Sequence, residues 1–442
     1  MTVEQNRLAR REQGNIGSRM LLPMIVAMLM GALYVMDAPN MVRFLAGGAF
    51  LAILLFVKEE TSFYMLMFIL SGNEMLNFGT TSIAMIFVML YTVKSFLFSG
   101  FKYRVMGSVV ISMIALLAAS AWAYVGDGES AQLVATVKLI FFLYYTARVL
   151  QVVEDRQRLF VNAFRFVAFG INFFSIVSVL FNGLPVLTER FAFHDRVTIN
   201  FLGITSAVTI TNLLYANIVL KRGNTARDVA LMIGCGVWGI LTQSRSFLLA
   251  TGIGILLLCF LAASVKQQGK LLRGIILAVL AFAVAAAVIP GFWDRIQVVI
   301  DRILTPSEDD ISNGRYDLWE WSISQMKRMG LTWFGAGDYT KFQIVDVEKG
   351  NVAHNFLIET WVIYGYIGCA AVIAVFTAFI RHYVFNVPKV KFKLITIVPL
   401  AVMVGALLFS HHFIGRSFCM VFVLNWLPIT FGTTTATDKQ QI

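Results

Sequence analysis

Charged side chains are scarce in this chain of 442 residues, since Asp, Glu, Lys and Arg together make up only 14%. Soluble domains carry about 25% charged residues, so this chain has too few polar side chains to cover an ordinary globule. Hydrophobic residues account for 58% of the sequence, and its mean hydropathy is +0.75. The composition excludes a soluble globular protein and predicts an integral membrane protein.

Cysteine is also rare, and no common nucleotide or nucleophile motif is present. The four cysteines lie in apolar runs without paired spacing: Cys235, Cys259, Cys369 and Cys419. Such cysteines are typical of small buried hydrophobes, so we predict neither disulfides nor metal ligands. The sequence contains no nucleotide-binding P-loop, dinucleotide fingerprint or serine nucleophile elbow.

Apolar runs of membrane length recur along the chain. A span needs about 20 apolar residues. We place runs near 20–37, 41–57, 62–78, 80–99, 105–125, 131–152, 159–181, 199–220, 228–243, 246–264, 271–289, 353–381, 394–411 and 413–431. Glu74 interrupts one of them and indicates a broken helix. The predicted fold class is an all-α polytopic membrane protein with about 12–14 transmembrane helices and one long periplasmic or extracellular helical loop.

The runs divide the chain into five predicted segments. A cytoplasmic N-terminal segment (1–19) precedes a transmembrane helix bundle (20–289), a long outer loop (290–352), C-terminal transmembrane helices (353–431) and a cytoplasmic tail (432–442). Within the loop, apolar residues at helical spacing predict an amphipathic helix from about Gly314 to Met329. Ser312 or Asn313 is positioned to cap its start, and Gly330 to end it.

Lysine and arginine are distributed unevenly between the loops. The short loops at 37–40, 71–79 and 126–130 contain neither, whereas every alternate loop is basic. This is the positive-inside bias, and it predicts a cytoplasmic N-terminus. It also accounts for much of the formal net charge of +11, so we predict no nucleic-acid partner. The charged segments 182–198 and 290–352 are predicted to lie outside.

Arg245 is the first residue that could carry chemistry. It lies in the segment 242–246, between two apolar runs, at a turn predicted to face outward. An arginine near the hydrocarbon boundary is energetically costly and usually functional. Alternatively, Arg245 extends its guanidinium to lipid phosphates and has no further role.

Arg315 and His354 also stand at predicted outer starts of helices. An arginine at a helix N-terminus is unfavourable, because its charge opposes the macrodipole. A bound anion there would be favoured by the guanidinium and by the free N–H groups of the helix start. The alternative for Arg315 is an ion pair with Asp317. A neutral imidazole at His354 is suited to be a general base. Alternatively, His354 is an interfacial residue bonded to a carbonyl group.

Further polar residues are predicted to line the same outer cavity. They are Arg190, His194 and Arg196 of segment 182–198, with Asn355 beside His354. A simple interfacial loop would also explain the first three. We predict no metal site, because Asp37 is the only acid of the first outer loop and cannot supply paired carboxylates. The acidic run at 308–310 is interpreted as a solvated turn.

These residues resemble the shared C-terminal signature of the O-antigen ligase and Wzy-type polymerase superfamily. The resemblance covers about residues 230–370 and rests on segments 242–245, 314–319, 334–337 and 354–355, followed by Gly365 and Gly368. The family is similar to GT-C glycosyltransferases and transfers glycans from a polyprenyl diphosphate carrier at the outer face of the bacterial inner membrane. The resemblance implies that Arg245 and Arg315 bind the carrier diphosphate and that His354 activates the acceptor hydroxyl.

The sequence analysis therefore favours a polysaccharide polymerase for O-antigen, exopolysaccharide or capsule. By resemblance, it needs no metal or cofactor, and its partners are an undecaprenyl diphosphate-linked oligosaccharide donor, an acceptor glycan and membrane lipids. An O-antigen ligase, which moves glycan onto lipid A–core, is the alternative enzyme. A lipid-linked oligosaccharide flippase is the alternative of another class. A flippase should place charges along a path through the bilayer, whereas the notable charges here cluster at one predicted face, which favours an enzyme.

Overall fold

The computed structural model describes most of the chain up to residue 380. The described residues are 20–79, 81–99, 107–127, 131–153, 155–183, 190–197, 199–220, 225–261, 269, 273, 276–277, 279–280, 283–284, 286–304, 315–336, 355–380 and 402. His354, the acidic run at 308–310 and most of the predicted C-terminal spans lie outside the described residues.

Helices make up nearly all of the described chain. They are Met20–Val35, α2 (Asn40–Phe56), α3 (Glu59–Leu70), α4 (Ile83–Ser99), α5 (Gly107–Asp127), α6 (Ala131–Val152), α7 (Arg156–Asn182), α8 (Ile199–Tyr215), the π-helix η1 (Ala216–Leu220), α9 (Thr225–Leu241), α10 (Arg245–Leu261), α12 (Phe292–Leu304), α13 (Arg315–Arg328) and α14 (Phe356–Ile380). The strands β1 (Asn77–Phe78) and β2 (Thr81–Ser82) form one antiparallel hairpin, with Asn77 opposite Ser82.

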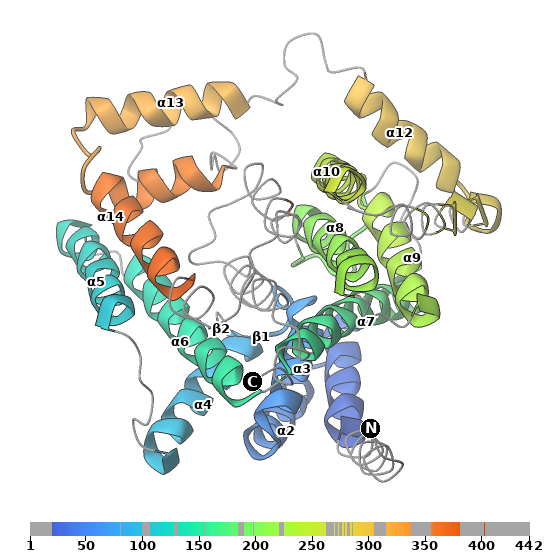
Figure 1. The fold of residues 1–442 in the computed structure, drawn as a ribbon, viewed down its shortest axis with the longest axis horizontal. Helices are drawn as coiled ribbons and strands as arrows, with labels where there is room; N and C mark the ends of the chain where they lie inside the picture. Colours follow the sequence, from blue (N-terminus) through green and yellow to red (C-terminus); the bar gives the residue numbers. More distant parts are fainter. Residues whose placement is uncertain are drawn as a thin grey trace, which may run out of the picture.

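The helices pack as a bundle in which each helix contacts sequence neighbours or helices from distant parts of the chain (Figure 1). α14 packs on α5, which packs on α6, while α7 contacts α3, α8 and α9. α3 and α8 form the interior, since Ser62–Leu70 and nearly all of α8 are buried. α13 lies beside α14, and α12 lies across the molecule beside α9 (Figure 1).

The apolar helices confirm an all-α membrane protein. Among the described residues, three helices are long and apolar enough to cross a membrane: Gln157–Asn182, Ile199–Ile218 and Phe356–Val375. Shorter apolar helices accompany them, namely Met20–Val35, Asn40–Phe56, Ile83–Phe98, Val110–Trp122 and Arg245–Phe260. The total of about 12–14 spans stays a prediction.

The run predicted near 62–78 is not a complete span. Its helix α3 begins earlier, at Glu59, and ends at Leu70. A polar turn follows, in which Asn77 Nδ2 donates to the Glu74 carbonyl oxygen at 2.6 Å, and the β-hairpin begins there. The interruption expected at Glu74 is therefore confirmed, but the chain turns back as a hairpin instead of continuing as a helix.

The outer loop contains one predicted helix and one that was missed. α13 matches the amphipathic helix predicted for residues 314–329, and Gly330 ends it with φ +69°. The N–H groups of Gly330 and Leu331 donate to the carbonyls of Lys327 and Met326, which is a Schellman motif. No helix was predicted for the residues of α12, although its first turn carries Asp294, which favours a helix start.

Candidate functional site

Loops predicted to lie on the outer face are brought together in the structure. The Tyr34 hydroxyl donates to the Asn77 carbonyl oxygen at 3.1 Å, which ties the first helix to the hairpin. His194 Nε2 lies 3.3 Å from Asp37 Oδ2, and the Phe191 N–H donates to the Leu241 carbonyl oxygen. We call this assembly of residues 34–43, 77–79, 190–197 and 241–245 the turn cluster.

Loops predicted to be cytoplasmic meet near the beginning of α7, whereas the turn cluster lies near its end. Arg158 Nε lies 3.9 Å from Glu60 Oε1, near the beginning of α7. Asn182, the last residue of α7, lines a cavity of the turn cluster. A helix of 27 residues is about 40 Å long, which is enough to cross a bilayer core. The two sets of loops are thus separated as membrane topology requires.

Arg245 begins α10 directly after a tightly bonded turn. The Thr242 side chain donates to the Gly239 carbonyl oxygen at 2.6 Å and accepts from the Ser244 N–H at 3.2 Å. Gln243 has φ +50°, a left-handed conformation that is uncommon for residues other than glycine and clusters at functional sites. Arg245 therefore stands at the start of a helix, as predicted, and its turn belongs to the turn cluster.

Arg190 is bonded to the same turn. Its Nε donates to the Thr242 carbonyl oxygen at 3.1 Å, and its Nη2 donates to Asn200 Oδ1 at 3.4 Å. Ser244 Oγ also donates to Asn200 Oδ1, at 3.3 Å. Arg190 lines a cavity of about 530 Å³ together with His194. A guanidinium so placed helps to fix the turn that carries Arg245.

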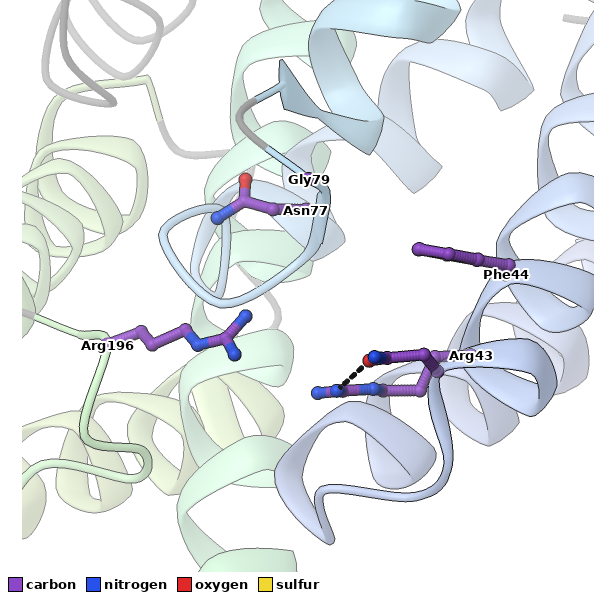
Figure 2. A pocket seen from close by; sticks show the side chains of 6 residues that line it. Arg43, Phe44, Asn77, Gly79 and Arg196 are labelled. Carbon is purple, nitrogen blue, oxygen red and sulfur yellow. Dashed lines mark hydrogen bonds between the residues drawn. The ribbon is translucent and has the colours of Figure 1, made fainter.

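Arg196 lines a second pocket of the turn cluster, of about 460 Å³ (Figure 2). Arg43 lies on the opposite wall, where its Nη1 donates to Asp37 Oδ1 at 2.9 Å and its Nη2 to Asn40 Oδ1 at 2.5 Å. Sequence reasoning missed Arg43, although an arginine near the beginning of an apolar run is a recognisable signal.

Arg315 begins α13, as predicted, and the loop after this helix is joined to α14 at Gly365. Gly365 has φ +62° and bends α14 (Figure 1). Beside the bend, the N–H groups of Tyr366 and Ile367 donate to the carbonyls of Thr332 and Trp333. The loop thus replaces helical hydrogen bonds that the bend removes, as interrupted membrane helices require.

The family-like residues Phe334-Gly335-Ala336 make this joint. The Ala336 N–H donates to the Val362 carbonyl oxygen at 2.6 Å. A Cβ atom on Gly335 would overlap the carbonyl group of Ile363, and one on Gly365 would overlap that of Trp333. Glycine is therefore required on both sides, because the two backbones touch.

Asn355 caps α14. Its Oδ1 accepts from the N–H groups of Leu357 at 3.0 Å and Ile358 at 3.3 Å, and the residue is buried. This is the usual N-cap arrangement, so Asn355 has a structural role at the helix start. His354 directly precedes this cap and lies outside the described residues.

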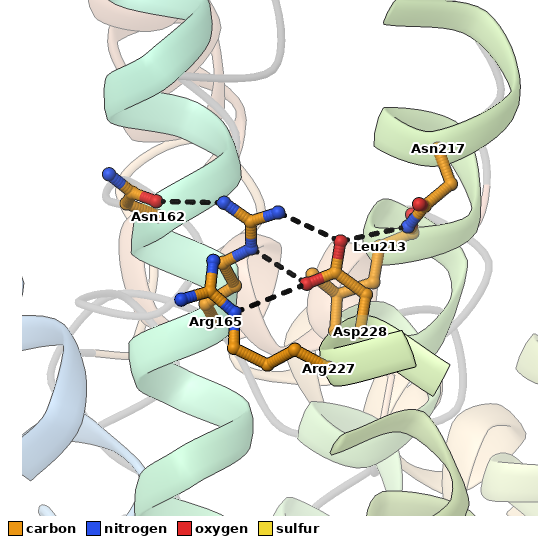
Figure 3. A network of polar contacts seen from close by, with 6 residues as sticks. All are labelled: Asn162, Arg165, Leu213, Asn217, Arg227 and Asp228. Atoms are coloured by element: carbon orange, nitrogen blue, oxygen red, sulfur yellow. Dashed lines mark hydrogen bonds and ion pairs between the residues drawn. The ribbon is translucent and has the colours of Figure 1, made fainter. Parts of the chain in front are cut away.

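A buried ion pair between α7 and α9, outside the turn cluster, was also missed (Figure 3). Arg165 Nε and Nη2 donate to Asp228 Oδ1 and Oδ2 at 2.7 and 2.9 Å. Asn217 of η1 donates to Asp228 Oδ2 at 3.1 Å, and Asn162 accepts from Arg165 Nη1 at 3.0 Å. Opposite charges inside two apolar runs were the available signal.

The fold and the turn cluster define an all-α membrane protein with polar sites at one end of its bundle. Residues 230–373 match the family model described as O-antigen ligase. The chain therefore carries a domain of the O-antigen ligase and Wzy-type superfamily, and the resemblance seen in the sequence is confirmed. The matched residues include Arg245, Arg315, His354 and both glycines of the joint. Neither the curated proteins nor the solved structures gave a match.

At the family level, this match supports a membrane enzyme that ligates or polymerises polysaccharide, with a lipid-linked glycan and an acceptor as its partners. The family and the apolar helices together suggest the inner membrane of a bacterium.

Proposed function

We propose that this protein is a polysaccharide polymerase that uses an undecaprenyl diphosphate-linked glycan as its donor. The acceptor is a sugar hydroxyl of a second glycan, and the reaction takes place at the outer face of the membrane. The main support is the O-antigen ligase domain at residues 230–373, whose Arg245 lies in the turn cluster.

Arg245 and Arg315 bind the diphosphate in this proposal. During transfer, the bond between the anomeric carbon and the phosphate oxygen breaks, and negative charge develops on the diphosphate. Two guanidinium groups at helix starts can stabilise this charge through paired hydrogen bonds without a metal ion. The bonds within the 242–246 turn hold the start of α10 in place before the substrate arrives.

His354 is the general base of the proposed reaction. The acceptor oxygen attacks the anomeric carbon opposite the leaving diphosphate, so the configuration inverts, and the imidazole takes the hydroxyl proton. The cap made by Asn355 supports this role, because it fixes the backbone next to His354. Arg190 and Arg196 line the neighbouring cavities, where glycan is expected to lie.

Two other functions are tested by the same preparation. An O-antigen ligase would use the same donor site but transfer the glycan to lipid A–core. A flippase would need charged groups exposed along a path through the bilayer. The charged pair found inside the bundle, Arg165 and Asp228, is bonded to its own neighbours, which favours an enzyme.

The deciding experiment incubates the purified protein with lipid-linked repeat units, alone or with lipid A–core. A polymerase makes longer lipid-linked chains from the repeat units alone, and the reaction persists in EDTA. His354→Gln should lower turnover by about 10²–10⁴-fold while carrier binding remains, because glutamine cannot accept the proton. Arg245→Lys and Arg315→Lys should also lose most turnover, because lysine offers no planar pair of donors.

Arg227→Gln is the matched control, since this arginine of α9 lies beside Asp228, outside the turn cluster, and its side chain is largely exposed. Product formation only with lipid A–core would identify a ligase. Movement of the intact carrier across proteoliposomes, without a longer product, would contradict both enzymes. Wild-type turnover by both lysine variants would show that the arginines only contact lipid.

A further inference from the structure

We propose that the pocket between Arg43 and Arg196 binds the carboxylate of an acidic sugar in the acceptor glycan. This inference deepens the proposed function and rests on it for the source of the ligand. The pocket lies between α2, the β-hairpin and segment 190–197, and it is lined by Asn40, Arg43, Phe44, Asn77, Gly79 and Arg196 (Figure 2).

Arg43 is held rigidly on one wall. It is only 8% exposed, and its guanidinium is bonded to Asp37 and Asn40. Its Cζ atom also lies 5.3 Å from the centre of the Tyr34 ring, a cation–π contact. A guanidinium has more N–H donors than these two bonds use, so Arg43 can still bind a ligand oxygen.

Arg196 is placed on the other wall by its neighbours. Phe193 is buried against Phe174, with ring centres 5.7 Å apart, and Phe191 stacks on Trp238 at 5.2 Å. The Arg196 N–H donates to His194 Nδ1 at 3.0 Å. Its guanidinium points toward the pocket (Figure 2), and no carboxylate of the described residues lies within ion-pairing distance of it.

The charges beside the pocket are not balanced. Of its two arginines, Arg43 is paired with Asp37, whose other carboxylate oxygen lies 3.3 Å from His194 Nε2, while the Arg196 N–H donates to His194 Nδ1. Two guanidinium groups therefore stand against one carboxylate, and one further negative charge would balance them.

The remaining lining favours a sugar that carries this charge. Asn40 and Asn77 provide amide groups for hydroxyls, and Phe44 is 43% exposed, so its ring is available to the apolar face of a sugar. A volume of about 460 Å³ exceeds the needs of a carboxylate alone. Asp37 would repel a doubly charged phosphate more strongly than a single carboxylate, so a uronic acid residue fits best.

The test measures direct binding to the full-length protein in nanodiscs of phosphatidylcholine. The probes are methyl glucuronide and its uncharged counterpart, methyl glucoside, observed by saturation-transfer NMR. We expect glucuronide to bind and glucoside to bind at least tenfold more weakly. Arg196→Gln should reduce glucuronide affinity by about tenfold, since it removes a hydrogen bond to a charged group. Arg227→Gln, with the same change of charge, should have no effect.

Several outcomes would overturn the proposal. Equal binding of the two probes would show that the pocket does not recognise the carboxylate of the glucuronide. Stronger Arg196-dependent binding of inorganic pyrophosphate, or loss of glucuronide binding in nanodiscs that contain phosphatidylglycerol, would assign the pocket to a phosphate of the carrier or of a lipid.

A second readout separates this inference from the proposed function. Arg245→Lys should lose most transfer but leave glucuronide binding unchanged. Arg196→Gln should raise KM for an acceptor that ends in uronic acid and leave kcat unchanged. If the wild-type protein binds glucuronide but transfers no glycan, the proposed function fails and the pocket stands. If transfer occurs and glucuronide does not bind, only the pocket assignment fails.

Discussion

Two arginine–aspartate pairs, one in the turn cluster and one between α7 and α9, have the same chemistry and different surroundings. Arg165 Nε lies 2.7 Å from Asp228 Oδ1, and Arg43 Nη1 lies 2.9 Å from Asp37 Oδ1. The Asp228 side chain is completely buried, whereas that of Asp37 is 59% exposed. The bonding distance therefore does not distinguish a structural pair from one that lines a pocket.

The difference lies in what else each pair contacts. Asp228 also accepts a hydrogen bond from Asn217 and lies 3.9 Å from Arg227, so its network joins α7, η1 and α9 around a fully buried carboxylate (Figure 3). Asp37 faces Arg43 and also His194, and the pocket beside it holds a second arginine (Figure 2). A pair whose carboxylate is fully buried stabilises helix packing, whereas a pair with an exposed carboxylate beside a pocket remains able to bind a ligand.

The largest expected effect is that of Asp228→Asn, which leaves Arg165 without its carboxylate in the interior. Breaking one partner of a buried pair costs about 3–5 kcal/mol, so the thermal unfolding midpoint in detergent should fall sharply. Replacing both residues by leucine should recover part of this loss, because no buried charge then remains. An unchanged midpoint for Asp228→Asn would show that the pair is solvated, as Asp37 is.

The next effect concerns the joint between the outer loop and α14, where no charge takes part. Gly335→Ala should cost about 1–3 kcal/mol and lower transfer, because the new methyl group would overlap the Ile363 carbonyl. The measurements are thermal unfolding and glycan transfer. Gly252→Ala in α10 is the matched control, since a Cβ there meets nothing within 4 Å. Equal behaviour of the two variants would contradict the close backbone contact.

Asp37→Asn should have a smaller effect on stability, about 0–1 kcal/mol, because its carboxylate is largely exposed. The same variant should change ligand preference, since the pocket loses the group that repels phosphate. We expect several-fold tighter binding of pyrophosphate, measured by the same NMR titration as glucuronide. A loss of stability similar to that of Asp228→Asn would erase the distinction between the two pairs.

The smallest effect is that of salt. Raising NaCl from about 0.05 to 0.5 M shortens the screening length, so glucuronide binding at the exposed pocket should weaken a few-fold. The midpoint difference between wild type and Asp228→Asn should hardly change, because buried pairs are screened little. Parallel titrations of binding and unfolding would test this contrast.

The sequence predicted most helices to within a few residues. The runs near 41–57, 131–152 and 159–181 became α2, α6 and α7. Apolar segments in a bilayer must satisfy their backbone groups internally, so hydropathy alone specifies a helix. The start of α10 at Arg245 and of α13 at Arg315 were predictable for the same reason, since both are local.

Contacts between distant residues were not predictable in this way. Arg165 pairs with Asp228 in another apolar run, and His194 meets Asp37 from a loop that is far away in the sequence. The hairpin after α3 was missed because a short polar break does not reveal the direction of the returning chain. The joint at Gly335 and Gly365 depends on two backbones that meet only after the helices pack.

Hydropathy and short motifs in the sequence were enough to predict a helical membrane protein and the family whose model matches residues 230–373. These properties follow from local hydropathy and from motifs that each occupy a few neighbouring residues. The packed helices, in contrast, show which charges are paired in the interior and which lie beside a pocket. The reason is that a charge acquires its role from the groups around it, and helix packing brings those groups together.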